Sequence, residues 1–289
     1  MSPFATRYRT ETIEGHELFF REAGDPSRPA VVLLHGFPAS SFMFRDLIAA
    51  LADRYHVVAP DHLGFGRSAS PPVDAFDYTF DRLTALTLAL LDRIGVRRFA
   101  LYLQDYGAPI GFRIASRHPD RVTALTSQNG NAYVEGFTPF WDGLFAYAAD
   151  GVTNERAVRE SLEPAGTQWV YTHGVPADRL DRLSPDTWTL DQVALDRSGN
   201  REVQLALFRD YRNNIDEYPA FQEYFRAHRP PTLVVWGEHD EIFGPDGALA
   251  FRRDLPDAEI HLLDAGHYAL ETSGEEIAGL VRSFLGRVL

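Results

Sequence analysis

The sequence predicts an α/β fold in which a mostly parallel, eight-stranded sheet is flanked by helices and carries an inserted helical cap. Short apolar runs recur along the chain as continuous stretches, as expected for parallel strands covered on both faces. Helical patterns separate most of these runs, which is typical of strand–helix–strand units. Between about residues 131 and 226 this alternation gives way to helical patterns rich in aromatic residues, Asp, Arg and Pro.

The individual elements follow from the same patterns. Two alternating stretches near the N-terminus, residues 8–13 and 17–22, favour an antiparallel edge hairpin. The apolar runs that predict buried strands are residues 30–34, 57–59, 99–103, 122–125, 233–236 and 260–263. The clearest helical patterns between them cover residues 41–51, 80–94 and 107–117.

The break in the alternation predicts the domain organisation. We expect residues 1–130 and 227–289 to form the core domain, and residues 131–226 to form a helical cap domain. Because the insertion follows the carboxyl end of a strand, it should cover the edge of the sheet where α/β proteins bind ligands.

Composition narrows the class of protein. With 289 residues, 45% of them hydrophobic, the chain can bury one sizeable core. A net charge of −13 argues against a nucleic-acid or anionic-membrane partner, so we expect a small-molecule substrate. The absence of Cys and Lys excludes disulfides, thiolate chemistry and a Schiff-base lysine. We expect no cofactor, and either a monomer or a homodimer.

The sequence shows no recognisable targeting signal. The first residues lack the basic-then-apolar layout of a signal peptide. No window approaches the ~20 apolar residues of a membrane span. We therefore expect a cytoplasmic protein without membrane contact.

The stretch LYLQDYGAPIG, residues 101–111, places a charged residue where a buried strand turns into a helix. A strand that runs into a tight turn and a helix is the layout of a nucleophile elbow, with Asp105 as the nucleophile. Gly107 would let the helix pack closely on the turn, whereas Leu103 stands where a small glycine is usual. Asp105 could equally be the N-cap of the following helix.

Three further segments lie at the ends of predicted strands. His35, Gly36, Phe37 and Pro38 follow the first buried strand, where backbone N–H groups of an oxyanion hole usually arise. Asp240 and His267 follow the last two strands and could supply an acid and an imidazole. Their order along the chain, nucleophile, acid, histidine, is that of a hydrolase triad.

Two other acids near these segments need an explanation. Asp264 competes with Asp240 for the acidic role, but its position three residues before His267 favours a role in shaping that turn. Glu238 and Glu241 flank Asp240 and could suggest a metal site, yet the sequence has no typical metal-ligand spacing. We therefore expect ordinary loop acidity and no metal.

Together these residues resemble the aspartate-nucleophile branch of the α/β-hydrolase superfamily. The resemblance rests on the segment at 35–38, on Asp105, Asp240 and His267, and on the run DHLGFGRS at 61–68, and it covers nearly the whole chain. That branch contains epoxide hydrolases, haloalkane dehalogenases and haloacetate dehalogenases. A serine-esterase interpretation lacks a nucleophile, because no Gly-x-Ser-x-Gly occurs.

An aspartate nucleophile predicts the kind of substrate. A carboxylate with a reference pKa of about 3.9 is anionic at neutral pH and can attack a saturated carbon that bears a leaving group. The resulting alkyl ester can be hydrolysed, whereas the ether that serine would form cannot. We expect His267, oriented by Asp240, to activate the water. The backbone N–H groups of Phe37 and Tyr106 would stabilise the oxyanion.

The leaving group is the remaining question. Epoxide opening needs a proton donor, and the resemblance to soluble epoxide hydrolases implies Tyr211 for this role, with Tyr147 as a second ring-opening tyrosine. A halide needs N–H donors, usually Trp or Asn, but Tyr106 and Phe37 occupy the positions where dehalogenases often have them. Trp141 or Trp169 could still supply one N–H.

The elbow and the inserted segment resemble different enzymes of this branch. Gln104 and Leu103 beside the nucleophile resemble a dehalogenase, whereas the tyrosines of the insertion resemble an epoxide hydrolase. A haloacetate would need arginines close after Asp105, and the nearest is Arg113.

We therefore predict an epoxide hydrolase, with a haloalkane dehalogenase that uses the same triad as the alternative and a non-catalytic binding protein as the second alternative. Phe37, Trp141, Phe145 and Phe243 are expected to bind a small hydrophobic substrate, with water as the second reactant.

Overall fold

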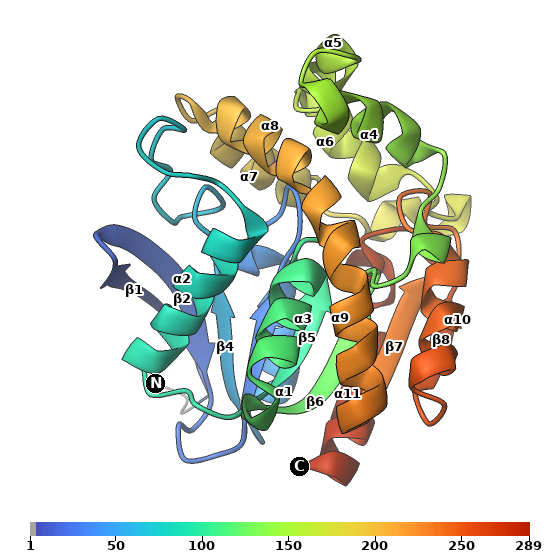
Figure 1. Ribbon diagram of the computed structural model, residues 1–289. Coiled ribbons are helices and arrows are strands. Elements are labelled where there is room, and N and C mark those ends of the chain that lie inside the picture. Colours follow the sequence, from blue (N-terminus) through green and yellow to red (C-terminus); the bar gives the residue numbers. More distant parts are fainter. Residues whose placement is uncertain (1–3) are drawn as a thin grey trace.

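The computed structural model describes residues 4–289, and its centre is an eight-stranded sheet (Figure 1). The strands lie in the order β1-β2-β4-β3-β5-β6-β7-β8. β1 pairs antiparallel with β2, and β2 pairs antiparallel with β4, whereas all other neighbours are parallel. The predicted fold class, including the edge hairpin, is confirmed.

The strands lie where the apolar runs predict them. Their bounds are β1 Arg7–Ile13, β2 His16–Ala23, β3 Ala30–Leu34, β4 His56–Pro60, β5 Phe99–Gln104, β6 Val122–Gln128, β7 Thr232–Gly237 and β8 Glu259–Leu263. The central strands β4, β5 and β7 are buried along their whole length, which explains why their sequences are continuous rather than alternating. The hairpin turns at Glu14 and Gly15, which both have positive φ as a tight two-residue turn requires.

Helices cover both faces of the sheet. The helices that belong to the alternating part of the chain are α1 Arg45–Leu51, α2 Phe80–Arg93, α3 Gly107–Arg117, α10 Pro245–Asp254 and α11 Ala269–Val288. The stretch expected as one helix at 41–51 begins as a 3₁₀ turn, Ser41–Phe44, before α1. α2, α3 and α9 (Arg212–His228) lie side by side on one face, and α1 packs with α11 on the other (Figure 1).

The remaining helices lie above the carboxyl ends of the parallel strands (Figure 1). They are α4 Phe140–Asp150, α5 Glu155–Glu160, α6 Pro164–Thr172, α7 Pro185–Leu195 and α8 Asn200–Asp210, all between β6 and β7 in the chain. α9 continues from α8 but runs down the flank of the sheet against α3. Across residues 4–289 no helix is both long and apolar enough to cross a membrane.

Two glycines of α3 set how closely this helix approaches the sheet. A Cβ at Gly107 would lie 2.0 Å from the carbonyl oxygen of Leu34, so only glycine permits this contact between the start of α3 and β3. A Cβ at Gly111 would lie 2.1 Å from Cδ2 of Leu103. Leu103 is the bulky residue that stands where hydrolase elbows usually have glycine. It is accommodated because residue 111 of α3, which packs against it, is a glycine.

We predict that Gly111→Ala destabilises the protein by about 1–3 kcal/mol, because the added methyl overpacks the contact with Leu103. This cost exceeds the roughly 1 kcal/mol that alanine gains over glycine in a helix interior. In a Leu103→Ala background, where the methyl has room, the same substitution should be neutral or stabilising. Urea unfolding of the four proteins measures the difference.

Gly279→Ala is the matched control, since Gly279 is an exposed helical glycine with no atom within 4 Å of its Cβ position. It should stabilise the protein by up to about 1 kcal/mol. An equal cost of Gly111→Ala in both backgrounds would show that Leu103 is not what excludes a side chain at position 111.

Candidate active site

The turn between β5 and α3 holds Asp105 in an unusual backbone conformation. Its φ is +46°, a region that non-glycine residues seldom adopt and that is common at functional turns. The side chain does not cap α3, because the N-cap position is Tyr106 and no side chain caps it. Instead Oδ1 of Asp105 accepts the backbone N–H of Phe37 at 2.7 Å, and the carboxylate also accepts the N–H of Tyr106.

The loop that supplies the Phe37 N–H packs directly on the elbow. A Cβ at Gly36 would lie 2.2 Å from Cβ of Asp105, so a side chain here would push the loop and the carboxylate apart. The neighbouring His35 is fully buried and accepts the backbone N–H of His62 at 3.1 Å, and burial lowers its pKa to about 4. A neutral imidazole therefore helps to fix this loop.

The structure brings His267 and Asp240 together beside Asp105. Nδ1 of His267 lies 2.8 Å from Oδ2 of Asp240, and Nε2 lies 3.8 Å from Oδ2 of Asp105. All three side chains are buried. Because a carboxylate can only accept, Nδ1 carries a hydrogen and Nε2 is the atom left for proton transfer.

Asp240 is held by an array of donors. Its Oδ1 accepts the backbone N–H groups of Ile242 at 2.8 Å and Phe243 at 3.1 Å. Its Oδ2 accepts the amide of Asn129 at 2.7 Å as well as His267. A buried carboxylate held by this many donors fixes the orientation of the imidazole ring.

Opposing effects set the charges of the group. Burial alone would lower the pKa of His267, but the carboxylates of Asp240 and Asp105 reverse the effect and raise it above its ordinary value. Burial also raises the pKa of Asp105, and His267 with the two backbone N–H donors opposes that rise. The imidazole and the elbow carboxylate therefore stabilise each other's charged form.

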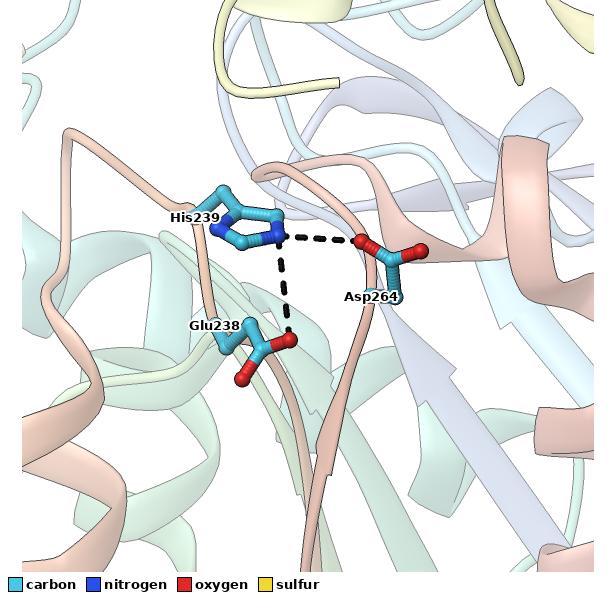
Figure 2. A group of neighbouring side chains, drawn as sticks. All are labelled: Glu238, His239 and Asp264. Carbon is cyan, nitrogen blue, oxygen red and sulfur yellow. Dashed lines mark hydrogen bonds and ion pairs between the residues drawn. The ribbon is translucent and has the colours of Figure 1, made fainter. Parts of the chain in front are cut away.

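The competing acid lies outside this group. Asp264 is exposed and pairs with Nε2 of His239 at 2.9 Å, while Glu238 lies 3.7 Å from the same nitrogen (Figure 2). Nη2 of Arg179 also contacts Asp264, at 3.1 Å. The ligand-capable atoms of this cluster lie within 4.8 Å of one another, but its exposure and its own guanidinium do not suit a cation. Glu241 pairs separately with His173 at 2.8 Å.

An apolar cavity of about 220 Å³ opens onto Asp105. Its walls come from the 35–38 loop, from the elbow, from α4, α6 and α8, and from the loop after β7. The lining residues are Phe37, Asp105, Tyr106, Phe140, Trp141, Leu144, Ser161, Gly166, Trp169, Val170, Phe208 and Ile242. Asp105 is the only carboxylate among them, so a ligand in this cavity meets one buried anion in aromatic surroundings.

Two of the four residues predicted to bind substrate line this cavity, namely Phe37 and Trp141. Phe145 and Phe243 do not; their rings pack against the indole of Trp141, with centroids 5.4 and 5.1 Å away. The indole N–H of Trp141 donates to the carbonyl of Ile242 at 2.8 Å. This hydrogen bond uses the donor that the ring could otherwise offer to a ligand.

The two predicted tyrosines differ in position. Tyr211 is buried at the junction of α8 and α9, with its ring 5.7 Å from that of Tyr106, and the charge of Asp105 contributes to its raised pKa after burial and Tyr218. Tyr147 is also buried, but its ring packs beneath the guanidinium of Arg209, 5.7 Å away. Neither tyrosine is among the residues that line the cavity.

Three polar residues near the group were given no place in the site by the sequence analysis. Tyr218 accepts a hydrogen bond from the phenol of Tyr211 and another from Asn131. The amide of Gln104 lies 3.0 Å from Nε2 of His267. Asn129 holds Asp240 from a position of positive φ. The signal for Asn129 is its position directly after β6, the neighbour of the strand that Asp240 follows.

Comparisons with known proteins agree with this architecture. A family model described as alpha/beta hydrolase fold matches residues 29–273. The chain is 41% identical to an uncharacterized hydrolase of Saccharomyces cerevisiae, over 96% of this chain and 97% of that protein. It is 31% identical to haloalkane dehalogenase 2 of Mycobacterium tuberculosis, over 88% and 86% of the two chains. Among solved structures, the haloalkane dehalogenase DatA of Agrobacterium tumefaciens superposes with a TM-score of 0.82 at 22% identity, covering 99% of this chain and 98% of that one.

We predict that Asp240→Asn lowers the pKa of His267, because it removes the nearer of the two anions that raise it. A raised pKa in the folded protein stabilises the fold below the unfolded value of about 6.5, and this contribution is lost as the pH rises through the folded pKa. Imidazole ¹⁵N chemical shifts, followed against pH and assigned with His267→Gln, measure the change.

Asp264→Asn is the control, since Asp264 contacts His239 rather than His267. It should leave the titration of His267 in place. If Asp240→Asn did the same, Asp240 would not be the electrostatic partner of this imidazole.

Proposed function

Because the chain belongs to the α/β-hydrolase fold family and carries a buried aspartate at its elbow, we propose that it is an epoxide hydrolase that acts through a covalent ester on Asp105. In the first step a carboxylate oxygen of Asp105 attacks an epoxide carbon. The carbon–oxygen bond of the ring breaks, and the ring oxygen leaves as an alkoxide that takes a proton from Tyr211.

The second step regenerates the carboxylate. His267 removes a proton from water, and the hydroxide adds to the carboxyl carbon of the ester. The backbone N–H groups of Phe37 and Tyr106, which already bind the Asp105 carboxylate, stabilise the oxyanion. Collapse of this intermediate breaks the bond to the alkyl oxygen, which takes the proton that remains on the added hydroxide, so a vicinal diol leaves and the Asp105 carboxylate is restored. The imidazolium returns its proton through solvent to the Tyr211 phenolate.

We favour an epoxide as the substrate because phenols that can donate a proton lie near Asp105. The buried phenol of Tyr211 donates to that of Tyr218. Burial raises the pKa of both phenols, and the charge of Asp105 acts on each of them in the same direction. Two phenols in series can hold and deliver the proton that an alkoxide needs. In this proposal Tyr218 replaces Tyr147 as the partner of Tyr211.

A haloalkane dehalogenase is the second candidate, favoured by the relative in M. tuberculosis and by Gln104 beside the nucleophile. Halide binding needs free N–H donors, and the indole of Trp141 is already bonded to a backbone carbonyl. Of the two tryptophans that line the cavity, this leaves Trp169 as the one whose indole N–H could bind a halide. Haloacetate has less support. Arg113 is bonded to Asp81 and Asn214, and none of the residues that line the cavity is an arginine.

The helices above the sheet complete the proposal. We infer that residues 131–226 act as a cap domain, with α4, α6 and α8 providing most of the apolar wall around Asp105. A cavity of about 220 Å³ with aromatic walls suits a small hydrophobic epoxide together with water.

We predict that the purified protein converts small aryl or alkyl epoxides to diols and releases no halide from 1-bromoalkanes of similar size. Tyr211→Phe should lower kcat for the epoxide by about 10²–10⁴-fold, the usual contribution of a general acid. Diol formation by chromatography and halide release by ion chromatography measure both reactions.

Tyr147→Phe removes a phenol of similar burial that faces Arg209 and should leave kcat within about two-fold, the range expected for a group outside the reaction. Halide release that is insensitive to Tyr211→Phe would favour the dehalogenase instead.

The covalent step has its own test. After one turnover in H₂¹⁸O, with enzyme in excess over substrate, the label should appear in the carboxylate of Asp105, because water attacks the ester at the carboxyl carbon. Mass spectrometry of the peptide that contains residues 99–117 locates it. Label found in the diol alone would mean that water attacks the epoxide directly.

A further inference from the structure

Gln104 is a buried carboxamide with one half of its hydrogen-bonding capacity unused. It ends β5 directly before the elbow and is fully enclosed. Its Nε2 lies 3.0 Å from Nε2 of His267, whereas its Oε1 has no hydrogen-bond partner. A buried carbonyl oxygen without a partner is rare, because its desolvation on folding is then not offset by a hydrogen bond.

The unpaired oxygen lies against the elbow. The point where a Cβ of Gly36 would stand is 2.6 Å from Oε1 of Gln104 and 2.3 Å from Oδ1 of Asp105. Both oxygens therefore lie against the same glycine of the oxyanion loop. The carboxamide thus faces the base on one side and the nucleophile on the other.

The base nitrogen explains why an amide belongs here. Nδ1 of His267 carries a hydrogen for Asp240, so in the neutral imidazole Nε2 has a free lone pair, which the amide of Gln104 satisfies. In the resting protein the amide thus occupies the place beside Nε2 that a water must take during ester hydrolysis.

Such a water has two hydrogens to place. One is directed at Nε2 of His267, which removes it. The other needs an acceptor close to both the imidazole and the carboxyl carbon of Asp105. The unpaired Oε1 of Gln104 has the right chemistry and position for it, and an oriented water attacks with less loss of entropy than a mobile one.

We propose that Oε1 of Gln104 binds the hydrolytic water and aims it at the ester on Asp105. This inference rests on the proposed covalent route, and it assigns to Gln104 a role in the second step alone. The first step needs the Asp105 carboxylate and a proton donor, and neither depends on the amide. Removing the amide should therefore slow hydrolysis of the ester and spare its formation.

The test separates the two steps. Gln104→Met keeps the length and apolar stem of the side chain and removes both polar atoms. In stopped-flow experiments with an epoxide substrate, ester formation, followed by protein fluorescence, should stay within about three-fold of the wild type, whereas ester hydrolysis should slow by about 10–100-fold. The ester should then accumulate and raise the mass of the intact protein by that of the epoxide.

A second variant guards against a folding defect. Gln104→Asn keeps the amide but withdraws it by one methylene, and it should show the same loss confined to hydrolysis. Gln204→Met removes another buried glutamine, which lies in α8 and whose amide donates hydrogen bonds to Gly64 and Asn200. This variant should change neither step. His267→Gln is the positive control, because removal of the base must trap the ester.

The outcomes distinguish the two proposals. If His267→Gln traps the ester but both Gln104 variants hydrolyse it at the wild-type rate, or lose both steps equally, the role of Gln104 is refuted and the covalent route stands. If no variant traps an ester and Asp105 takes up no ¹⁸O, the covalent route itself is refuted.

Discussion

The whole site depends on how closely two loops approach each other at the end of β3 and β5. Asp105 occupies a positive-φ turn, and its carboxylate reaches the backbone N–H of Phe37 only because Gly36 has no side chain. Gly107 allows α3 to start almost in contact with the carbonyl of Leu34, which fixes the turn on β3. Since β3 and β5 are neighbours in the parallel sheet, this contact follows from strand order and from two missing side chains. The strain of the turn is stored in the elbow and supported by the packed core beneath it.

The second constraint is electrostatic, because the imidazole of His267 lies between two buried carboxylates. Asp240 lies 2.8 Å from Nδ1 of His267 and is held in place by three further donors, whereas Asp105 lies 3.8 Å from Nε2 and faces the cavity. Along the proposed route, esterification removes the charge of Asp105. The imidazole then loses one of the two anions that raise its pKa and becomes easier to deprotonate. The first step thus prepares the base that the second step requires.

The sequence predicted the parts of the site that depend on backbone topology. Parallel strands leave a clear apolar pattern, and the residues that follow them, Asp105, Asp240 and His267, must meet at one edge of the sheet. The inserted helices were harder, because a helical pattern does not reveal which side faces the cavity. Tyr147 and Phe145 therefore lie away from it, although both are buried as aromatic residues usually are. For Gln104 the sequence showed only a likeness to a dehalogenase elbow, because a glutamine at a strand end has many uses and its unpaired oxygen exists only in three dimensions.

The helices above the sheet are tied to the catalytic loops by buried hydrogen bonds as well as by apolar packing. The phenol of Tyr171 in α6 donates to Asp191 in α7, and its ring stacks on that of Tyr268 with centroids 3.9 Å apart. Tyr268, next to His267, donates to the carbonyl of Phe37 at 2.7 Å. Burial raises the pKa of Asp191 well above its usual value, as expected for an acid enclosed between these elements. α6 also supplies cavity-lining residues, so the shape of the cavity and the position of the oxyanion loop are set by one connected group of side chains. A displacement of α6 that widened the cavity would have to break these buried bonds, and the proposed oxyanion hole would lose part of its support.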